Sequence, residues 1–535
     1  MIPVIQRALQ MFRPPRHRSA LWRRLRDEAP WMIAVVLSST AILAAIPSLN
    51  HPWGSNWPMY FESARYFWDP SAVYFGWRPP MYPLALASLG NQMGYVAAAH
   101  LIAQISMVVI VVSTGLFARL MAGVWPAVLA ALSIPLLQCA VEGAMWTNMY
   151  PPAAAALAMA AALGAATWRH PRFGMALLAG IAAGFAWRIN HLGLVALPMG
   201  LGLTLLGASY TEKMTRWLGL PILFTLGVGG MVAVDMWVVE RWNVPQESLS
   251  DQVIQRRREE LDRLANQPPG ADLFSACTDF TPKPLNLTEL TNTCGQQFIG
   301  ANYGTLASED CVPSIPTLMW LLPLTLLPAA RRRDWRDSAA SILVFGGPIG
   351  AFVVAAGWTS YAEKYAISYL PMMALLVPLA FDRLGSWVGR LFDRVRLGRW
   401  LGFGAAAAWL VTTWPGADSA HADQPNIQTD WESVAGRVAT WSQTNVGPDD
   451  TIIDCVPLNI DLVLLPTIRT TLEGVSTEHS CMAWSIEPPE SSGQVWMVQQ
   501  AFPDIIDTQP SHMIRHGWIL IEQYDDRHRL WLHQP

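Results

Sequence analysis

The chain has 535 residues, of which 52% are apolar and only 14% carry a charged side chain, and its mean hydropathy is +0.25. Soluble domains carry about 25% charged residues, so this composition excludes a disordered chain, a coiled coil and a typical soluble enzyme. It indicates a membrane protein, and the formal net charge of −4 gives no sign of a nucleic-acid partner.

Eleven apolar stretches are candidate membrane-spanning helices, each of which needs about 20 mostly apolar residues. In chain order they cover residues 31–49, 94–116, 124–141, 151–168, 173–187, 192–209, 218–240, 315–330, 338–357, 366–381 and 400–415. The stretches at 173–187 and 315–330 are the weakest, because both are short. The predicted fold class is a polytopic α-helical membrane protein with about eleven spans.

The segments between these spans differ sharply in charge from one side of the membrane to the other. Alternation places one set of segments on the same side: 1–30, 117–123, 169–172, 210–217, 331–337 and 382–399. This set holds 21 Lys and Arg against 7 Asp and Glu, whereas the rest of the chain holds 15 against 33. Basic residues in short loops stay on the cytoplasmic side, so we expect a cytoplasmic N-terminus and an external C-terminus.

The predicted domains follow from this topology. Residues 1–30 form a basic cytoplasmic segment, residues 31–415 form the transmembrane domain, and residues 416–535 form an external domain large enough for its own core. Two long external loops, 50–93 and 241–314, interrupt the transmembrane domain.

The last of these domains has an α/β pattern. Residues 431–444 read as a helix, 451–455 and 494–499 read as strands, and 517–524 with 529–533 read as a closing hairpin. We therefore predict an extracytoplasmic α/β domain at the C-terminus.

Five of the six cysteines lie in external segments. In an oxidising compartment, a Cys455–Cys481 bridge and one more among Cys277, Cys294 and Cys311 are expected. The alternative is that all of them are ordinary thiols. No paired Cys-x-x-Cys motif occurs, so the spacings fit no zinc site.

The first external loop is the most informative stretch of the chain. It reads Asn56-Trp-Pro-Met-Tyr-Phe-Glu-Ser-Ala-Arg65 and, after a short interval, Arg78-Pro-Pro-Met-Tyr82-Pro. It resembles the first external loop of the GT-C glycosyltransferase superfamily, in the branch of dolichyl-phosphate-mannose protein mannosyltransferases and bacterial aminoarabinose transferases. In those loops an acidic residue precedes a Tyr and an Ala-Arg pair, and Arg-Pro-Pro-Leu-Tyr-Pro follows.

Two later stretches extend this resemblance. Leu-Ala-Gly-Ile-Ala-Ala-Gly-Phe-Ala-Trp-Arg188-Ile-Asn-His191 is similar to a glycine-rich span of the family that ends in an arginine. Glu-Lys364-Tyr365, followed by Tyr-Leu-Pro371, is similar to the family's late Arg-Tyr and Leu-Pro segment. The order of elements also matches: a long first loop, many spans and an external C-terminal α/β domain.

The resemblance implies an inverting transfer of a sugar from a polyprenyl-phosphate donor to an external lipid, protein or polysaccharide acceptor, in the inner membrane of a bacterium. This chemistry needs a carboxylate in the first loop that takes the acceptor proton or holds a metal. It also needs cations that stabilise the leaving lipid phosphate and an apolar groove for the lipid tail. The superfamily allows a divalent metal, but no ligand cluster in this sequence identifies one.

The sequence departs from the family pattern at Asn56, which stands where the family has aspartate and cannot act as a base. The nearest carboxylates are Glu62 and Asp69, which would share one helix face with Arg65 if residues 56–69 are helical. One interpretation makes Glu62 the catalytic carboxylate, with Arg65 setting its ionisation. The other makes these residues an ion-pair ladder on a surface helix.

Six residues of the matching motifs are expected to bind substrate: Arg78, Tyr82, Arg188, His191, Lys364 and Tyr365. Arg188 and Lys364 could hold the lipid phosphate, because ionisable groups at the mouth of a span are functional candidates. The alternative is that they only anchor the chain at the headgroup interface. Asp235, inside the span at 218–240, predicts a polar partner or water next to it.

Two other classes of function compete with an active glycosyltransferase. Asn56 favours a GT-C-like scaffold without catalysis, acting as a lipid-binding subunit of an envelope complex. A transporter or flippase would predict broken helices in two similar halves, and the sequence has no such symmetry. The layout favours the glycosyltransferase over the scaffold.

Overall fold

The structure is a computed structural model that describes residues 16–46, 57–69, 72, 74, 79–136, 138–145, 147–209, 214–245, 321, 323–327, 335–346, 363–413, 437–438, 441, 444–447, 450–454, 476–478, 493–500, 510–524 and 528–533. Contacts divide the chain into two compact units. The helical unit comprises Met1–Ser48, Tyr74–Ala85 and His100–Ala417, and the sheet unit comprises Leu49–Val73, Leu86–Ala99 and Asp418–Pro535. The first external loop is thus shared between the units.

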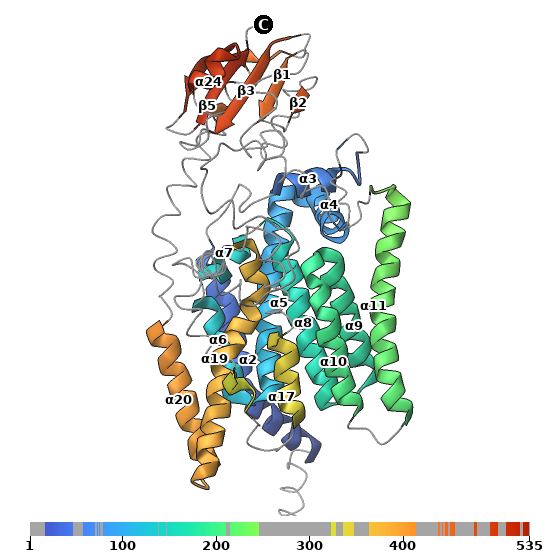
Figure 1. Cartoon of the computed structure of the whole chain (residues 1–535), viewed down its shortest axis with the longest axis vertical. Helices are drawn as coiled ribbons and strands as arrows, with labels where there is room; N and C mark the ends of the chain where they lie inside the picture. Colours follow the sequence, from blue (N-terminus) through green and yellow to red (C-terminus); the bar gives the residue numbers. More distant parts are fainter. Residues whose placement is uncertain are drawn as a thin grey trace, which may run out of the picture. The chain divides into compact units, whose positions relative to one another are not determined.

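Helices of very different length make up most of what is described of the helical unit (Figure 1). They are α2 (Arg16–Ala45), α5 (Tyr95–Met121), α6 (Val124–Ser133), α7 (Gln138–Met145), α8 (Tyr150–Arg169), α9 (Phe173–Ile189), α10 (Ala196–Ala208), α11 (Met214–Trp242), α17 (Trp335–Ser341), α19 (Glu363–Leu391) and α20 (Val395–Thr413). The chain passes between the two units within α4 (Met81–Met93) and near the start of α5.

Within the described part of the chain, four helical segments are long and apolar enough to cross a membrane: Asp27–Ala45, Tyr95–Met121, Tyr150–Arg169 and Met214–Trp242. Shorter apolar helices cover Val124–Leu136, Phe173–Ile189 and Gly193–Ala208. Helices are the expected solution, because a chain in lipid must satisfy its backbone hydrogen bonds internally. The predicted count of eleven spans is not confirmed, since 315–330 and 338–357 lie largely outside the described residues.

Two predicted spans are interrupted by short turns of 3₁₀-helix. The predicted span 124–141 breaks after α6 into a turn at Ile134–Leu136 and then α7, because Pro135 cannot donate the backbone hydrogen bond that a continuous helix needs. The predicted span 192–209 opens with a second such turn, at His191–Val195, before α10 begins.

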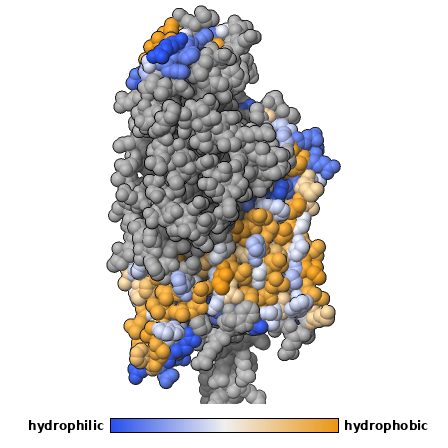
Figure 2. Space-filling view, in the orientation of Figure 1, coloured by the Kyte–Doolittle hydropathy of each residue, from blue (hydrophilic) through white to orange (hydrophobic). Residues whose placement is uncertain are grey.

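Apolar side chains also cover much of the outside of the helical unit. Figure 2 shows this apolar surface in orange. Along α11 the exposed large side chains are Met214, Trp217, Leu218, Ile222, Leu226, Val234, Met236 and Trp237. An exposed apolar face of this size on a long helix is suited to lipid contact rather than to water.

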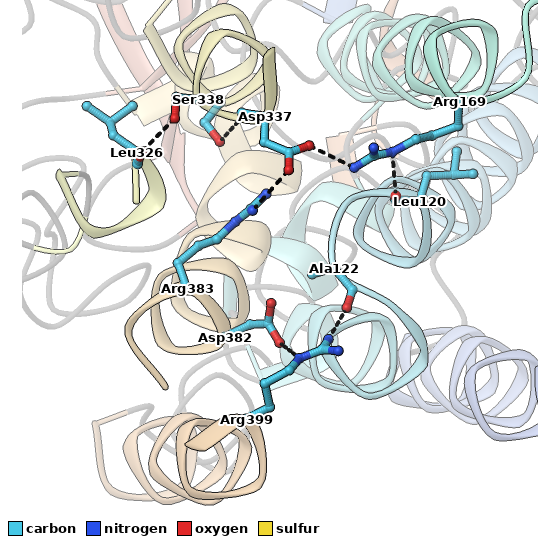
Figure 3. Close-up of polar contacts among 10 residues, drawn as sticks. Leu120, Ala122, Arg169, Leu326, Asp337, Ser338, Asp382, Arg383 and Arg399 are labelled. Carbon is cyan, nitrogen blue, oxygen red and sulfur yellow. Dashed lines mark hydrogen bonds and ion pairs between the residues drawn. The ribbon is translucent and has the colours of Figure 1, made fainter. Parts of the chain in front are cut away.

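A buried ion network joins three helices at one end of the helical unit (Figure 3). Asp337 in α17 receives a hydrogen bond of 2.9 Å from Arg169 Nη2, at the end of α8. Its other oxygen lies 3.6 Å from Nη1 of Arg383, in α19. Asp337 and Arg383 are each only 1% exposed, so their charges are compensated inside the protein.

Neighbouring ion pairs extend this network to further segments. Arg399 of α20 donates to Asp382 Oδ1 over 2.8 Å and also to the backbone carbonyl of Ala122 (Figure 3). Arg119 of α5 donates to Glu28 Oε1 over 2.5 Å.

These contacts bring together five of the six segments that alternation places on one side of the membrane: 1–30, 117–123, 169–172, 331–337 and 382–399. Their common location at one end of the helical unit is therefore confirmed. That this end faces the cytoplasm stays a prediction from the charge rule.

The sheet unit contains a five-stranded sheet of order β2-β1-β3-β5-β4. Its strands are β1 (Thr451–Asp454), β2 (Ser476–Glu478), β3 (Val495–Gln500), β4 (Trp518–Gln523) and β5 (His528–His533). Strand β1 pairs in parallel with β2 and β3, while β5 pairs antiparallel with both β3 and β4. The predicted closing hairpin is thus confirmed as β4–β5.

One face of the sheet packs against the short helix α24 (Pro510–Arg515). The apolar core there consists of Ile453, Val495, Met497, Met513, Trp518 and Trp531. The sequence pattern missed β2 and α24, which have only three and six residues and so show no clear periodicity. The predicted disulfide cysteines and most of the predicted helix 431–444 lie outside the described residues.

Candidate functional site

Glycines let helices α9 and α11 touch backbone to backbone. A Cβ atom on Gly180 would lie 2.0 Å from the carbonyl oxygen of Phe224, and one on Gly227 would lie 2.4 Å from the carbonyl oxygen of Leu177. Real Cβ atoms do not approach so closely, so any larger residue would force the helices apart. The glycine-rich character of this span therefore has a packing reason.

This close contact brings a buried ion pair together near the ends of the two helices. Arg188, in the last turn of α9, donates from Nη2 to Oδ2 of Asp235 in α11. The side chain of Asp235 is 1% exposed and that of Arg188 is 19% exposed. Arg188 Nε and Asp235 Oδ1 make no hydrogen bond to any described residue. Within the described part of the chain, Arg188 thus keeps this hydrogen-bond donor without a partner and Asp235 this acceptor.

Two aromatic side chains border the ion pair. The Arg188 guanidinium carbon lies 5.3 Å from the centre of the Trp187 ring. Tyr74, from the first external loop, is buried, and this burial is the main reason that the pKa of its phenol is raised. The negative charge of Asp235 raises the same pKa further, whereas the positive charge of Arg188 lowers it. Tyr74 therefore stays a neutral hydroxyl next to the pair.

The chain turns sharply directly after Arg188. Asn190, which is buried, donates its backbone N–H to the carbonyl of Ala186 over 3.1 Å, and its own carbonyl accepts from Gly193 over 2.8 Å. His191 opens the following 3₁₀ turn and is half-buried. Arg188 and His191 thus lie at the same end of α9, as the sequence predicts.

The sequence predicts a polar partner or water next to Asp235, and the structure identifies that partner as Arg188, which lies 47 positions earlier in the chain. The sequence marks both residues as charges near the ends of apolar spans, but it does not show that they meet. A pair of opposite charges at matching depths in neighbouring spans is the signal that could have found it.

The first-loop helix is shorter than expected. Helix α3 (Trp57–Arg65) ends four residues before Asp69, so Glu62, Arg65 and Asp69 do not share one continuous helix face. A turn follows in which the Asp69 N–H donates to the Arg65 carbonyl over 2.8 Å. Arg65 Nη2 and Asp69 Oδ2 are 4.0 Å apart, and their side chains are 22% and 40% exposed, so this partly solvated pair adds little stability.

The remaining predicted site residues are placed only in part. Glu62 belongs to α3, and Lys364 and Tyr365 belong to the first turn of α19, but their side chains lie outside the described part. Asn56 and Arg78 fall outside it altogether.

Tyr82 of α4 lies in the protein interior, with 2% exposure, and burial raises the pKa of its hydroxyl. A role for Tyr82 in binding substrate stays a prediction. The sequence motif identifies Tyr82 but does not show which way its ring is buried.

A small, mostly apolar cavity lies between α5, α8, α10 and α19 of the helical unit. Its volume is about 10 Å³, room for about one water molecule, and Ser113 and Thr114 are the polar side chains that line it. No group of three or more His, Cys, Asp or Glu side chains suited to a metal occurs among the described residues.

The glycine contact leads to a stability prediction. Gly227→Ala is expected to lower the unfolding temperature measurably. The added methyl group would clash with the backbone of α9 and push the two helices apart, which disrupts their packing. Gly230→Ala is the matched control, since a Cβ there meets nothing within 4 Å and alanine is the better helix former by about 1 kcal/mol. Thermal unfolding in detergent would separate the two variants, and equal stability would contradict the packing account.

No protein-family model matches the chain, and no protein of curated function matches it. Among solved structures, ArnT from Cupriavidus metallidurans bound to undecaprenyl phosphate is similar at a TM-score of 0.50 and 15% identity, over 94% of this chain and 99% of that chain. The Archaeoglobus fulgidus oligosaccharyltransferase has a TM-score of 0.46 and 13% identity, over 85% of this chain and 65% of its own. ArnT, the aminoarabinose transferase, is a GT-C superfamily member, and the likeness to it extends over nearly the whole of both chains. The protein therefore has a GT-C-like membrane fold.

Proposed function

We propose that the protein is a membrane glycosyltransferase that moves a sugar from a polyprenyl-phosphate donor to an external acceptor. The observation that carries this proposal is the fold similarity to an ArnT structure that contains undecaprenyl phosphate. The partly buried Arg188 cation at the end of an apolar helix supports it. The proposed location is a bacterial inner membrane, with a cytoplasmic N-terminus and the C-terminal domain in the periplasm.

In the proposed reaction, an acceptor oxygen or nitrogen attacks the anomeric carbon of the sugar, and the bond from that carbon to the phosphate oxygen breaks. The acceptor proton passes to a first-loop carboxylate, for which Glu62 is the candidate because Asn56 cannot accept it. The phosphate leaves with the bonding electrons, and Arg188 stabilises its growing negative charge.

The test is turnover of a panel of undecaprenyl-phosphate-linked sugars by the purified full chain. Arg188→Gln is expected to lower kcat/KM by about 10²–10³-fold, the usual effect of removing a charge-stabilising donor. Arg241→Gln is the matched control, because Arg241 is an exposed arginine in the last turn of α11. It should stay within about twofold of the unaltered chain. Full activity of Arg188→Gln would remove Arg188 from the mechanism.

The second candidate function is a lipid-binding scaffold without catalysis, which Asn56 favours. It predicts that the chain binds undecaprenyl phosphate but releases no sugar from any donor of the panel. Such a result would overturn the enzyme proposal and leave the lipid site standing.

A further inference from the structure

Arg188 already has an anionic partner within the protein. Its Nη2 donates to Asp235, and four-fifths of its side chain is buried with that carboxylate. An arginine paired in this way attracts phosphate less strongly than an unpaired arginine would, because the net charge of the pair is close to zero. Any phosphate that binds Arg188 must share it with Asp235 or displace it.

A phosphate bound to Arg188 would lie close to the Asp235 carboxylate. A phosphate that hydrogen-bonds to another nitrogen of the same guanidinium comes within about 5–7 Å of the Asp235 carboxylate, since the guanidinium spans only a few ångströms. In a partly buried site such repulsion between anions is much stronger than in water.

We propose that Asp235 is an internal competitor of the lipid phosphate for Arg188, and that this competition favours release of the polyprenyl-phosphate product. The inference rests on the proposed function. A sugar-bearing donor is a phosphodiester with one negative charge, whereas the product is a monoester with nearly two at neutral pH. Repulsion by Asp235 therefore acts more strongly on the product than on the donor.

Asp235→Asn tests the proposal, because asparagine keeps the shape and one acceptor oxygen but removes the charge. The purified variant is expected to bind undecaprenyl phosphate at least about tenfold more tightly than the unaltered chain. Asp235→Glu retains the charge and should stay within about threefold. In the Arg188→Gln background, Asp235→Asn should change the affinity far less, because the competition needs the arginine.

Thermal unfolding with and without the lipid provides a second measurement. Asp235→Asn leaves Arg188 without its buried counter-ion, so the variant should unfold at a lower temperature in the absence of lipid. Bound lipid should then raise its unfolding temperature more than it raises that of the unaltered chain. If the Asn variant is recovered in poor yield, Asp235→Ser gives the same expectation.

Weaker binding by Asp235→Asn would overturn the proposal, since Asp235 would then only orient Arg188. Equal binding would overturn it as well. The proposed function can fail on its own. If the chain binds undecaprenyl phosphate more tightly in Asp235→Asn but transfers no sugar, Asp235 competes with the phosphate as proposed, and the protein is not a glycosyltransferase. A chain that binds no undecaprenyl phosphate in any variant refutes both.

Discussion

Glu62→Gln is expected to lower kcat for sugar transfer by about 10²–10⁴-fold, the range lost when a general base is removed. Glutamine has nearly the shape of glutamate but cannot accept the acceptor proton. Donor binding should change little, because the carboxylate acts on the acceptor and not on the lipid phosphate. The measurement is sugar release under saturating donor, together with the Kd of undecaprenyl phosphate.

Three further variants show where the catalytic carboxylate lies. Glu240→Gln makes the same chemical change at an exposed position in the last turn of α11 and should leave kcat within about twofold. If Asp69→Asn loses activity while Glu62→Gln stays active, Asp69 and not Glu62 is the catalytic carboxylate. A gain of activity in Asn56→Asp would instead identify an enzyme that has lost its ancestral base.

Asp337→Asn is expected to destabilise the protein by about 3–5 kcal/mol, the cost of breaking a buried ion pair from one side. The change leaves Arg383 and Arg169 without their shared carboxylate, and Arg383 is only 1% exposed. The unfolding temperature in detergent should fall accordingly. Adding Arg383→Met to Asp337→Asn should recover part of the loss, because the uncompensated buried charge is then gone.

Glu28→Gln is the control for this prediction. Glu28 also pairs with an arginine at the same end of the helical unit, but its side chain and that of Arg119 are 35% and 31% exposed. Partly solvated pairs contribute only about 0–1 kcal/mol. A loss in Glu28→Gln as large as in Asp337→Asn would show that burial does not set the value of these pairs.

The charge pattern of the loops predicted more of the architecture than any single motif did. Alternation of the spans, supported by the excess of Lys and Arg, placed six segments on one side, and ion pairs such as Arg169–Asp337 bring five of them together at one end of the helical unit. The reason is that basic residues in short loops stay on one side of the membrane during insertion, so the composition of each loop indicates its side. The β4–β5 hairpin was predictable for a similar reason, since both strands and their turn are adjacent in sequence.

The first-loop motif predicted less. It grouped Glu62, Arg65 and Asp69 on one face on the condition that residues 56–69 are helical, but α3 ends at Arg65, so Asp69 lies outside that helix. Helix ends depend on capping and on tertiary packing, which a spacing rule leaves out. Tyr82 shows the same limit, because its motif says nothing about the burial of its ring.

By itself, the sequence determined that this is a multi-pass membrane protein with apolar helices, a basic end and a terminal hairpin, because these properties follow from composition and short-range pattern. Only the tertiary structure decided that Arg188 meets Asp235 and that Asp337 serves two arginines. Such pairs depend on which helices pack together and at what depth, and for α9 and α11 that is set by glycines whose neighbours lie more than 40 positions away in the chain.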